Sequence, residues 1–461
     1  MSGIFSTLNV ANKGLQAQQT ALHTTGHNIS NANTEGYSRQ RVELKASLAF
    51  TLGGVGQLGT GVKMNGIVRL VDDYVTKQIR EENGTFSKFS AKSDVLEQLE
   101  IVYNEPSDTS LNFNLGEMFD SWTELSKNPE LLTSKSIVVE KSKTMTDTLN
   151  HIATQLEGLK NDTTNLIGMN KDKFNSIVGS LDALNKQIFN ISIKGQIPND
   201  LLDQRDLFLK DLSSITEFTE KPDKYGRIEI KVEAGDSVTD TIVLSFDGKT
   251  KLEMAVFDNG AVTLGVTVFS PEKGEIAGYR EAFTEIDDQI AELNKFAVTI
   301  AEAINTVHGS NIFTFDKDPA EGTTAKNMQV STLIQNDNSL IQAGQIPGGP
   351  EGDGSRASAV ASVRNSRLDF TGDGTPDNTI ESAYNGMVTN VGISKQQSDN
   401  MVANQEVLLD QLVLRRESTS GVNIDEEVTN LIKFQKSFEA NARVIQVLSE
   451  MLDTLINRTG V

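Results

Sequence analysis

The sequence predicts an elongated, mainly α-helical protein of several domains, with one β-domain inserted in the middle. Its 461 residues exceed what a single hydrophobic core usually organises. Apolar residues recur at helical spacing near both ends of the chain and along most of its length. Between residues 218 and 269, alternating apolar residues and Asp-Gly or Asn-Gly turns replace that pattern, as is typical of β-hairpins.

Composition narrows the classes of function. The chain carries 42 Lys and Arg against 63 Asp and Glu, a net charge of −21, which argues against nucleic acid or an anionic membrane as the main partner. The absence of cysteine excludes disulfides, thiolate metal sites and cysteine nucleophiles. No stretch approaches the roughly 20 apolar residues that span a bilayer. The N-terminal residues lack the pattern of a cleavable Sec-type signal peptide, which predicts a cytoplasmic protein unless another export route operates.

The first segment, residues 4–29, predicts a helix with a coiled-coil seam. Its apolar and small residues recur with a mean step of 3.5. The seam positions are Ile4, Leu8, Ala11, Leu15, Gln18, Leu22, Thr25 and Ile29. The following stretch, "NISNANTEGYSRQRV", is rich in Asn, Ser and Gly, so it ends the helix and begins an extended segment. A glycine-rich stretch from residue 52 then precedes an alternating run at 62–68, which predicts a strand.

Helical patterns fill most of the next two hundred residues. We expect helices at 70–105, with a possible break at Asn83 and Gly84, around Trp122, and over the long stretch 133–193. The stretch "NDLLDQRDLFLKDLSSI" adds a short helix. After the β-hairpins, a helix is predicted from 279 to 308. Residues 309–380, rich in Gly, Asn, Asp and Ser, predict loop with short strands.

Two helical segments, 381–417 and 424–457, close the chain. The second repeats the 3.5 spacing of the first segment. Its seam positions are Val428, Leu431, Gln435, Phe438, Ala442, Ile445, Ser449 and Leu452. Two such seams at opposite ends of one chain are natural partners. We therefore expect a terminal helical core domain (1–50 with 418–461), a helical bundle domain (51–217 with 279–417, including the loop-rich 309–380), and an inserted β-domain (218–278).

The start of the last helix predicts local structural chemistry only. Glu426 and Glu427 lie in its first turn, where negative charge complements the helix dipole. Asn423 or Asp425 is expected to cap the helix. None of these residues requires a ligand.

Motifs for cofactors and metals are weak. The run Gly54 to Gly59 fits G-x-G-x-x-G but leads into a strand, so a glycine loop is the better interpretation. In the acidic stretch 369–378, four positions fit a calcium loop. Its position 12 is Ile380, where a bidentate Glu is needed, which favours an acidic turn over a calcium site. We predict no catalytic residues, cofactor or metal site, and hence no enzyme.

Several stretches resemble one family. "MSGIFSTLNVANKGLQAQQTALHTTGHNISNANTEGYSRQRVEL" is similar to the N-terminal motif shared by bacterial flagellar rod, hook and hook-associated proteins. "NDLLDQRDLFLKDLSSI", the Trp122 stretch and "RRESTSGVNIDEEVTNLIKFQKSFEANARVIQVLSEMLDTLIN" resemble the hook-associated members that join hook to filament. The resemblance covers the first ~220 and the last ~80 residues. It implies a structural subunit that polymerises in a tube, with the terminal helices innermost and the β-domain facing outward.

The resemblance also implies partners and a route. The subunit would leave the cell through the flagellar type III export apparatus, without a cleaved signal, and act outside the cell. Its partners would be further copies of itself in a ring, hook protein, the next hook-associated junction protein, and an export chaperone that binds the C-terminal helix. Hook protein, a flagellin-like filament protein and an enzyme on a helical scaffold remain alternatives. The residues expected at the assembly and chaperone interface are Leu8, Leu15, Leu22, Ile29, Val428, Leu431, Phe438, Ile445, Leu448 and Leu452.

Overall fold

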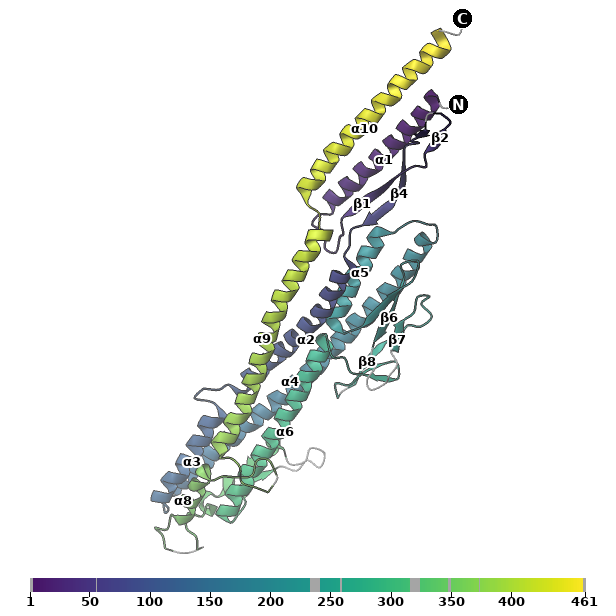
Figure 1. The fold of residues 1–461 in the computed structure, drawn as a ribbon. Helices are drawn as coiled ribbons and strands as arrows, with labels where there is room; N and C mark the ends of the chain where they lie inside the picture. The colour runs from purple at the N-terminus through teal and green to yellow at the C-terminus, as the bar shows by residue number, and fades with distance from the viewer. Residues whose placement is uncertain are drawn as a thin grey trace.

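The molecule is elongated, with long helices running along most of its length (Figure 1). The computed structural model describes residues 3–54, 56–232, 241–257, 259–315, 324–346, 350–372 and 374–458. The two terminal helices, α1 (Ile4–Ser30) and α10 (Ile424–Asp453), lie side by side at one end, with both chain termini beyond them. The expected mainly helical fold, with paired terminal helices and inserted strands, is confirmed.

A β-hairpin accompanies the terminal helices. Strand β1 (Gln40–Ala46) pairs antiparallel with β4 (Val62–Arg69), and beyond them β2 (Phe50–Leu52) pairs with β3 (Gly56–Leu58). A bulge follows Glu43 in the β1–β4 ladder. Both strands of that ladder contact α1. The predicted passage from helix to extended chain, and the strand at 62–68, are confirmed. Within the run Gly54 to Gly59, residues 56–58 form strand β3 of a hairpin.

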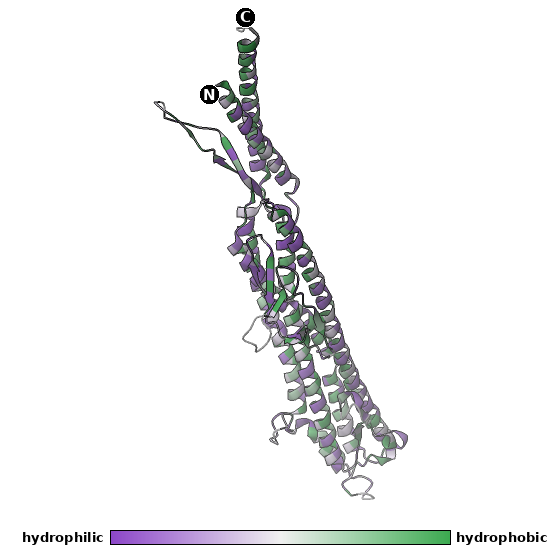
Figure 2. Ribbon diagram, turned by 90° about the vertical axis from the view of Figure 1, so that its right-hand side faces the viewer, coloured by the Kyte–Doolittle hydropathy of each residue, from purple (hydrophilic) through white to green (hydrophobic). Residues whose placement is uncertain are grey.

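The helical body consists of long, nearly parallel helices. They are α2 (Asp73–Tyr103), α3 (Leu111–Lys127), α4 (Leu132–Ser192), α5 (Asn199–Ile215), α6 (Glu275–His308) and α9 (Ile380–Ser420). The longest, α4, has 61 residues and extends about 90 Å. Trp122, Leu156, Phe296 and Tyr384 belong to one continuous core shared by α3, α4, α6 and α9. Figure 2 shows the apolar residues of these helices gathered along the inside of the bundle.

The break expected at Asn83 and Gly84 is wrong, because α2 continues without interruption through both residues. Gly84 serves a close approach instead. Its carbonyl oxygen accepts a hydrogen bond of 2.8 Å from the amide of Gly274, and a Cβ at Gly84 would lie 3.0 Å from the carbonyl oxygen of Ser213. The glycine therefore lets α2 pack directly on the segments that enter and leave the β-rich insertion.

The β-rich insertion forms two small antiparallel sheets. One has the order β5 (Thr219–Pro222), β6 (Ile228–Val232), β7 (Thr241–Leu244), and the other has the order β10 (Thr267–Phe269), β9 (Val262–Leu264), β8 (Met254–Val256). Both contribute to a second core together with Phe174 and Val178 of α4. Asn185 of α4 fixes the first sheet, since its side chain bonds both the amide and the carbonyl of Ile228.

The segment predicted as loop with short strands holds more structure than expected. It contains the strands β11 (Phe313–Phe315) and β12 (Met328–Val330), but also the helices α7 (Thr332–Asn336) and α8 (Ser355–Ser362). Helix α8 has eight residues, mostly Ser and Ala, which is too short and too weakly amphipathic to show a helical period. It packs against α3.

A three-residue break separates the last two helices. Helix α9 runs to Ser420, three residues beyond its predicted end, and α10 restarts at Ile424. The side chain of Asn423 caps α10 by accepting hydrogen bonds from the amides of Asp425 and Glu426, at 3.0 and 3.2 Å. Of the two expected caps, Asn423 is therefore the one used. None of the described helices combines the length and apolarity needed to cross a membrane.

Candidate assembly interface

Small and polar residues of α1 lie against α10. Gly14 lies against Asn441, where a Cβ would come within 2.7 Å of the Asn441 side-chain oxygen. Two heptads further, Asn28 contacts Glu427. Ala21, midway between Gly14 and Asn28, is buried. Because Gly14 and Ala21 have small side chains, the two helix axes can approach closely along this line.

Half of the predicted seam of α1 is thus displaced by one residue. Gly14 and Asn28 lie against α10, at the positions next to Leu15 and Ile29, where the prediction placed the contact. Leu8, Leu15, Leu22 and Ile29 are half-buried, one step around the helix from that line. The 3.5 period itself is retained, since Ala11 and Thr25, which were predicted correctly, are buried.

The same displacement occurs in α10. Glu427, Phe434, Asn441 and Leu448 occupy one set of heptad positions, and Glu427 and Leu448 are buried. The prediction had placed Val428, Gln435, Ala442 and Ser449 there. Val428 is 42% exposed and Gln435 is exposed, so their place in the seam with α1 is wrong. The other predicted set, Leu431, Phe438, Ile445 and Leu452, is half-buried, as expected for a seam at the edge of a two-helix contact.

Pairing with α1 leaves apolar residues of α10 in solvent. These residues are Ile424, Val428, Ile432, Val444, Val447 and Met451, and we call them the outer apolar surface of α10. Exposed apolar residues at this density on one helix are unusual for a monomeric protein and mark an interaction surface. Of the ten predicted interface residues, only Val428 belongs to it.

A buried polar cluster at the break between α9 and α10 is the feature that the sequence did not reveal. Glu427 accepts hydrogen bonds from Asn28 Nδ2 at 2.8 Å and from Arg39 Nη2 at 2.7 Å. Arg39 also reaches Glu426 at 3.0 Å, and its amide donates to the carbonyl of Ser420 at 2.9 Å. We call Asn28, Arg39 and Glu427 the polar joint. It ties α1, the chain before β1 and the start of α10 into one node.

Tyr37 and Gln40 provide the remaining hydrogen-bond partners of the Asn28 side chain. The Asn28 Oδ1 atom accepts from the Tyr37 hydroxyl at 2.7 Å and from the Gln40 amide at 3.0 Å, while Asn28 Nδ2 donates to the Gln40 carbonyl at 2.9 Å. Burial, with the negative charges of Asp200, Asp203 and Glu427, raises the pKa of Tyr37 well above its usual value. The Tyr37 hydroxyl therefore stays protonated and can serve as a permanent donor.

Helix α5 anchors this region to the helical body. Asp203 accepts from the amide of Ser38 at 3.1 Å and from Arg69 Nη1 at 2.7 Å, and Asp206 accepts from the same Arg69 nitrogen at 2.9 Å. Burial raises the pKa of Asp206, but Arg205 and Arg69 more than offset this, so the net pKa is lowered. For Asp203, burial outweighs its hydrogen bonds, and the pKa is raised. The aspartates of "LLDQRD" are thus structural anchors.

The weak cofactor and metal motifs have local roles. Asp369 accepts hydrogen bonds from the amides of Gly372 and Gly374, at 2.6 and 2.7 Å, as in an acidic turn. Asp373, the central residue of the calcium pattern, lies outside the described residues. Among the described residues, no group of three His, Cys, Asp or Glu side chains is arranged to hold a metal ion.

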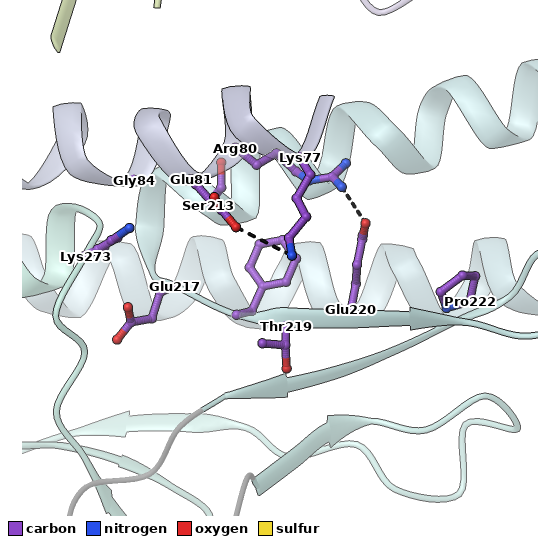
Figure 3. Close-up of a pocket in the computed structure, with 11 residues that line it drawn as sticks. Lys77, Arg80, Glu81, Gly84, Ser213, Glu217, Thr219, Glu220, Pro222 and Lys273 are labelled. Atoms are coloured by element: carbon purple, nitrogen blue, oxygen red, sulfur yellow. Dashed lines mark hydrogen bonds and ion pairs between the residues drawn. The ribbon is translucent and has the colours of Figure 1, made fainter. Parts of the chain in front are cut away.

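A cavity of about 310 Å³ lies where the chain enters and leaves the β-rich insertion (Figure 3). Acidic and basic side chains alternate on its walls. Arg80 of α2 forms an ion pair with Glu220 of β5, and Lys77 forms another with Glu81, with 3.6 Å between Lys77 Nζ and Glu81 Oε1. Burial raises the pKa of Glu220 despite Arg80. Since both pairs of opposite charge are matched within the cavity and its walls carry both signs, the cavity does not favour a ligand of either charge.

Comparison with known families agrees with this architecture. The family model "Flagellar hook-associated protein FlgK helical domain" matches residues 96–324, most of the helical body and the β-rich insertion. "Flagella basal body rod protein" matches residues 8–37, which hold most of α1, and "Flagellar basal body rod FlgEFG protein C-terminal" matches residues 416–458, which hold α10. The polar joint therefore connects the segments matched by the two rod-protein models.

Individual relatives span the whole chain. "Flagellar hook-associated protein 1" of Bacillus subtilis (strain 168) is 30% identical over 100% of this chain and 99% of its own length. The protein of the same name from Escherichia coli (strain K12) is 24% identical over 98% and 99%. The solved structure of the flagellar hook junction protein FlgK from Burkholderia pseudomallei shares the fold, with a TM-score of 0.63 and 14% identity over 75% of this chain and all of that chain.

Proposed function

This chain belongs to the flagellar hook-associated protein 1 family, a structural component of the flagellar hook–filament junction, and from that premise we propose how its terminal helices build the junction. Copies assemble by covering the outer apolar surface of α10 with the terminal helices of neighbouring copies. The single observation that supports this most is the set of valines, isoleucines and methionine that α10 exposes after its pairing with α1 is complete. Leu8, Leu15, Leu22 and Ile29 of α1 are half-buried, so part of their apolar area also remains open to neighbouring copies.

We further propose that the same surface binds an export chaperone before assembly. An amphipathic helix laid in a partner's groove is a common recognition mode, and α10 at the end of the chain is accessible for it. The two uses exclude one another because they bury the same side chains. The protein would then pass through the flagellar type III apparatus and act outside the cell, between hook protein and the next hook-associated protein. We infer that it acts by assembly and not by catalysis, as the names of its relatives suggest.

The domain division also stays a proposal. The terminal part would comprise α1, α10 and the β1–β4 hairpin, since the hairpin pairs across the boundary that we had expected at residue 50 and both of its strands contact α1. The helical bundle and the β-rich insertion would form the other two parts. The boundary between the terminal part and the bundle would lie at residues 421–423. The β-rich insertion would meet the bundle where Gly274 contacts Gly84.

Two substitutions on the outer apolar surface test the proposed function. Val428→Glu with Val447→Glu should leave the stability of the subunit within about 0.5 kcal/mol, because both side chains are exposed. In an assembly, each carboxylate would be buried without a partner, at roughly 3 kcal/mol apiece. We expect a strain whose own gene is replaced by this variant to carry hooks without filaments in electron micrographs. A pull-down of purified proteins should show weaker chaperone binding.

The matched control adds the same charge elsewhere on α10. Thr429 and Gln446 are exposed polar residues, so Thr429→Glu with Gln446→Glu should preserve filaments and chaperone binding. Measuring the secreted protein in the medium separates failed export from failed assembly. Normal filaments in the valine variant would contradict the assembly role, and unchanged chaperone affinity would place the chaperone site elsewhere.

A further inference from the structure

The β-hairpin that holds β1 to β4 is positively charged, unlike the rest of the chain. Residues 1–71 contain six Lys and Arg against two Glu, a net charge of +4 in a chain whose total is −21. Arg41, Lys45 and Lys63 are exposed side chains of the β1–β4 ladder, and Lys45 and Lys63 lie opposite one another. Lys45 forms a solvent-exposed ion pair with Glu43 at 3.4 Å. Within the described residues, Arg41 and Lys63 form neither an ion pair nor a hydrogen bond through their side chains. The hairpin therefore offers cationic groups to a partner.

The far part of the hairpin is apolar and exposed. Leu48 is 94% and Phe50 is 56% exposed, and Leu58, opposite Phe50 across the β2–β3 pair, is also exposed. Figure 2 shows this hairpin standing away from the paired terminal helices near the N-terminus. A short hairpin that holds aromatic and aliphatic side chains in water is not stabilised by them, so a partner that covers them accounts for their presence. We call Leu48, Phe50 and Leu58, with Lys45 and Lys63, the hairpin patch.

The second half of α9 has the complementary character. One side of α9 packs on α2, and the opposite side exposes Val407 (59%) and Leu414 (69%). Glu406 and Asp410 lie beside these residues, exposed, and neither is engaged in an ion pair or hydrogen bond with any described residue. Arg415, next to Leu414, is also exposed, so the two carboxylates leave a net negative charge on this surface. We call Glu406, Val407, Asp410 and Leu414 the outer patch of α9.

We propose that the hairpin patch of one copy docks on the outer patch of α9 of a second copy in the assembly. Apolar side chains of both patches would be buried together, with Lys45 and Lys63 facing Glu406 and Asp410. Opposite charges at such a contact fix its register and disfavour wrong partners. The proposal rests on the proposed self-assembly and names a second contact for it, outside the paired terminal helices.

Charge distinguishes α9 from the other exposed apolar helix face. Between its two exposed apolar groups, α10 carries Lys433, Lys436 and Arg443 with one acid, Glu439, which pairs with Lys436 at 3.1 Å, so a basic hairpin would meet net positive charge there. The hairpin and the outer patch of α9 lie on opposite sides of the polar joint along the molecule (Figure 1). A copy displaced along the long axis would therefore bring its α9 to the level of its neighbour's hairpin. Such a contact is head-to-tail, so it links each copy to a next one.

Cross-linking in assembled flagella tests this contact, and because this chain has no natural cysteine, the introduced thiols are the only ones on the subunit. The variant Phe50→Cys with Val407→Cys replaces the native protein, and isolated flagella are treated with a flexible bismaleimide, which does not demand disulfide geometry. On a denaturing gel we expect dimers and higher multiples of the subunit, with most of the monomer consumed. Leu48→Cys with Leu414→Cys is a second pair, should the first fail to build flagella.

Control variants show whether a cross-link is specific for the proposed contact. Each single cysteine variant should stay monomeric, as should Phe50→Cys with Val266→Cys, which places the second thiol on the exposed turn after β9. Intact flagella without a ladder would overturn the docking and leave the proposed function standing. A dimer from Phe50→Cys alone, or a cross-link to a different protein, would also overturn it. Bare hooks with the unaltered chain would instead refute the proposed function itself.

Discussion

Replacing Phe438 by Asp is expected to abolish filaments. Phe438 lies half-buried on the heptad positions of α10 that flank α1, where its ring contributes apolar area to the helix pair. Loss of that ring, together with a carboxylate placed against an apolar surface, should cost about 3 kcal/mol of pairing. Since a single isolated helix is marginal in water, α1 and α10 would then lose much of their order. Electron micrographs should show bare hooks, while the thermal unfolding of the helical body stays unchanged.

Gln435 supplies the control for this prediction, and it also tests the corrected register. The 3.5 pattern placed Gln435 in the seam beside Phe438, whereas the structure leaves it exposed. Gln435→Asp introduces the same charge within one turn of Phe438 and should preserve filaments. If Gln435→Asp were as damaging as Phe438→Asp, the seam would follow the sequence pattern and the structural register would be refuted.

The change Glu427→Gln should open the polar joint. The side chain of Glu427 is 3% exposed, and its charge is matched by Arg39. The amide keeps the shape of the side chain but leaves the half-buried Arg39 guanidinium with only the exposed Glu426. Removing one partner of a buried pair leaves an uncompensated charge, so we expect a loss of about 2 kcal/mol. Native-state hydrogen exchange should be faster at the amides of Arg39 and Gln40, which bond Ser420 and Asn28.

Glu426→Gln is the matched control, because it removes the other carboxylate that contacts Arg39. The Glu426 side chain is 60% exposed, and a pair of this kind contributes less than about 1 kcal/mol. Exchange at Arg39 and Gln40 should then remain close to that of the unaltered protein. Equal effects of the two substitutions would show that the joint gains its stability from surface electrostatics and not from the buried carboxylate.

Periodicity predicted the helices well because their apolar spacing is a local property of the chain. The bounds of α1 and the approximate starts of α4 and α10 followed from it, as did the change to strands after residue 218. The same reasoning misplaced half of each seam. It assigned contacts to large apolar residues such as Leu15 and Val428, whereas the helices approach where Gly14 and Asn28 permit it. Small residues carry no apolar signal, although they determine the distance between packed helices.

The polar joint could not be predicted from the sequence, for a different reason. Asn28 and Glu427 lie 399 residues apart in sequence, and each has a sufficient local explanation. Asn28 belongs to a stretch that ends a helix, and Glu427 lies in a first turn where an acid complements the helix dipole. Nothing in such local roles indicates that both side chains are buried against one another. Gly84 is similar, because a close approach to Gly274 leaves the same local signal as a helix break.

The central claim is that this subunit joins filament to hook through its terminal helices, and counting filaments on hooks measures it most directly. The recipient strain is derived from a motile bacterium. Its own gene of this family is deleted, so that its hooks carry no filaments. Expression of the unaltered chain should restore filaments on most hooks in electron micrographs, and expression of the chain without residues 424–461 should not. Hooks that stay bare although the unaltered protein reaches the medium, or filaments restored equally by the shortened chain, would contradict the account.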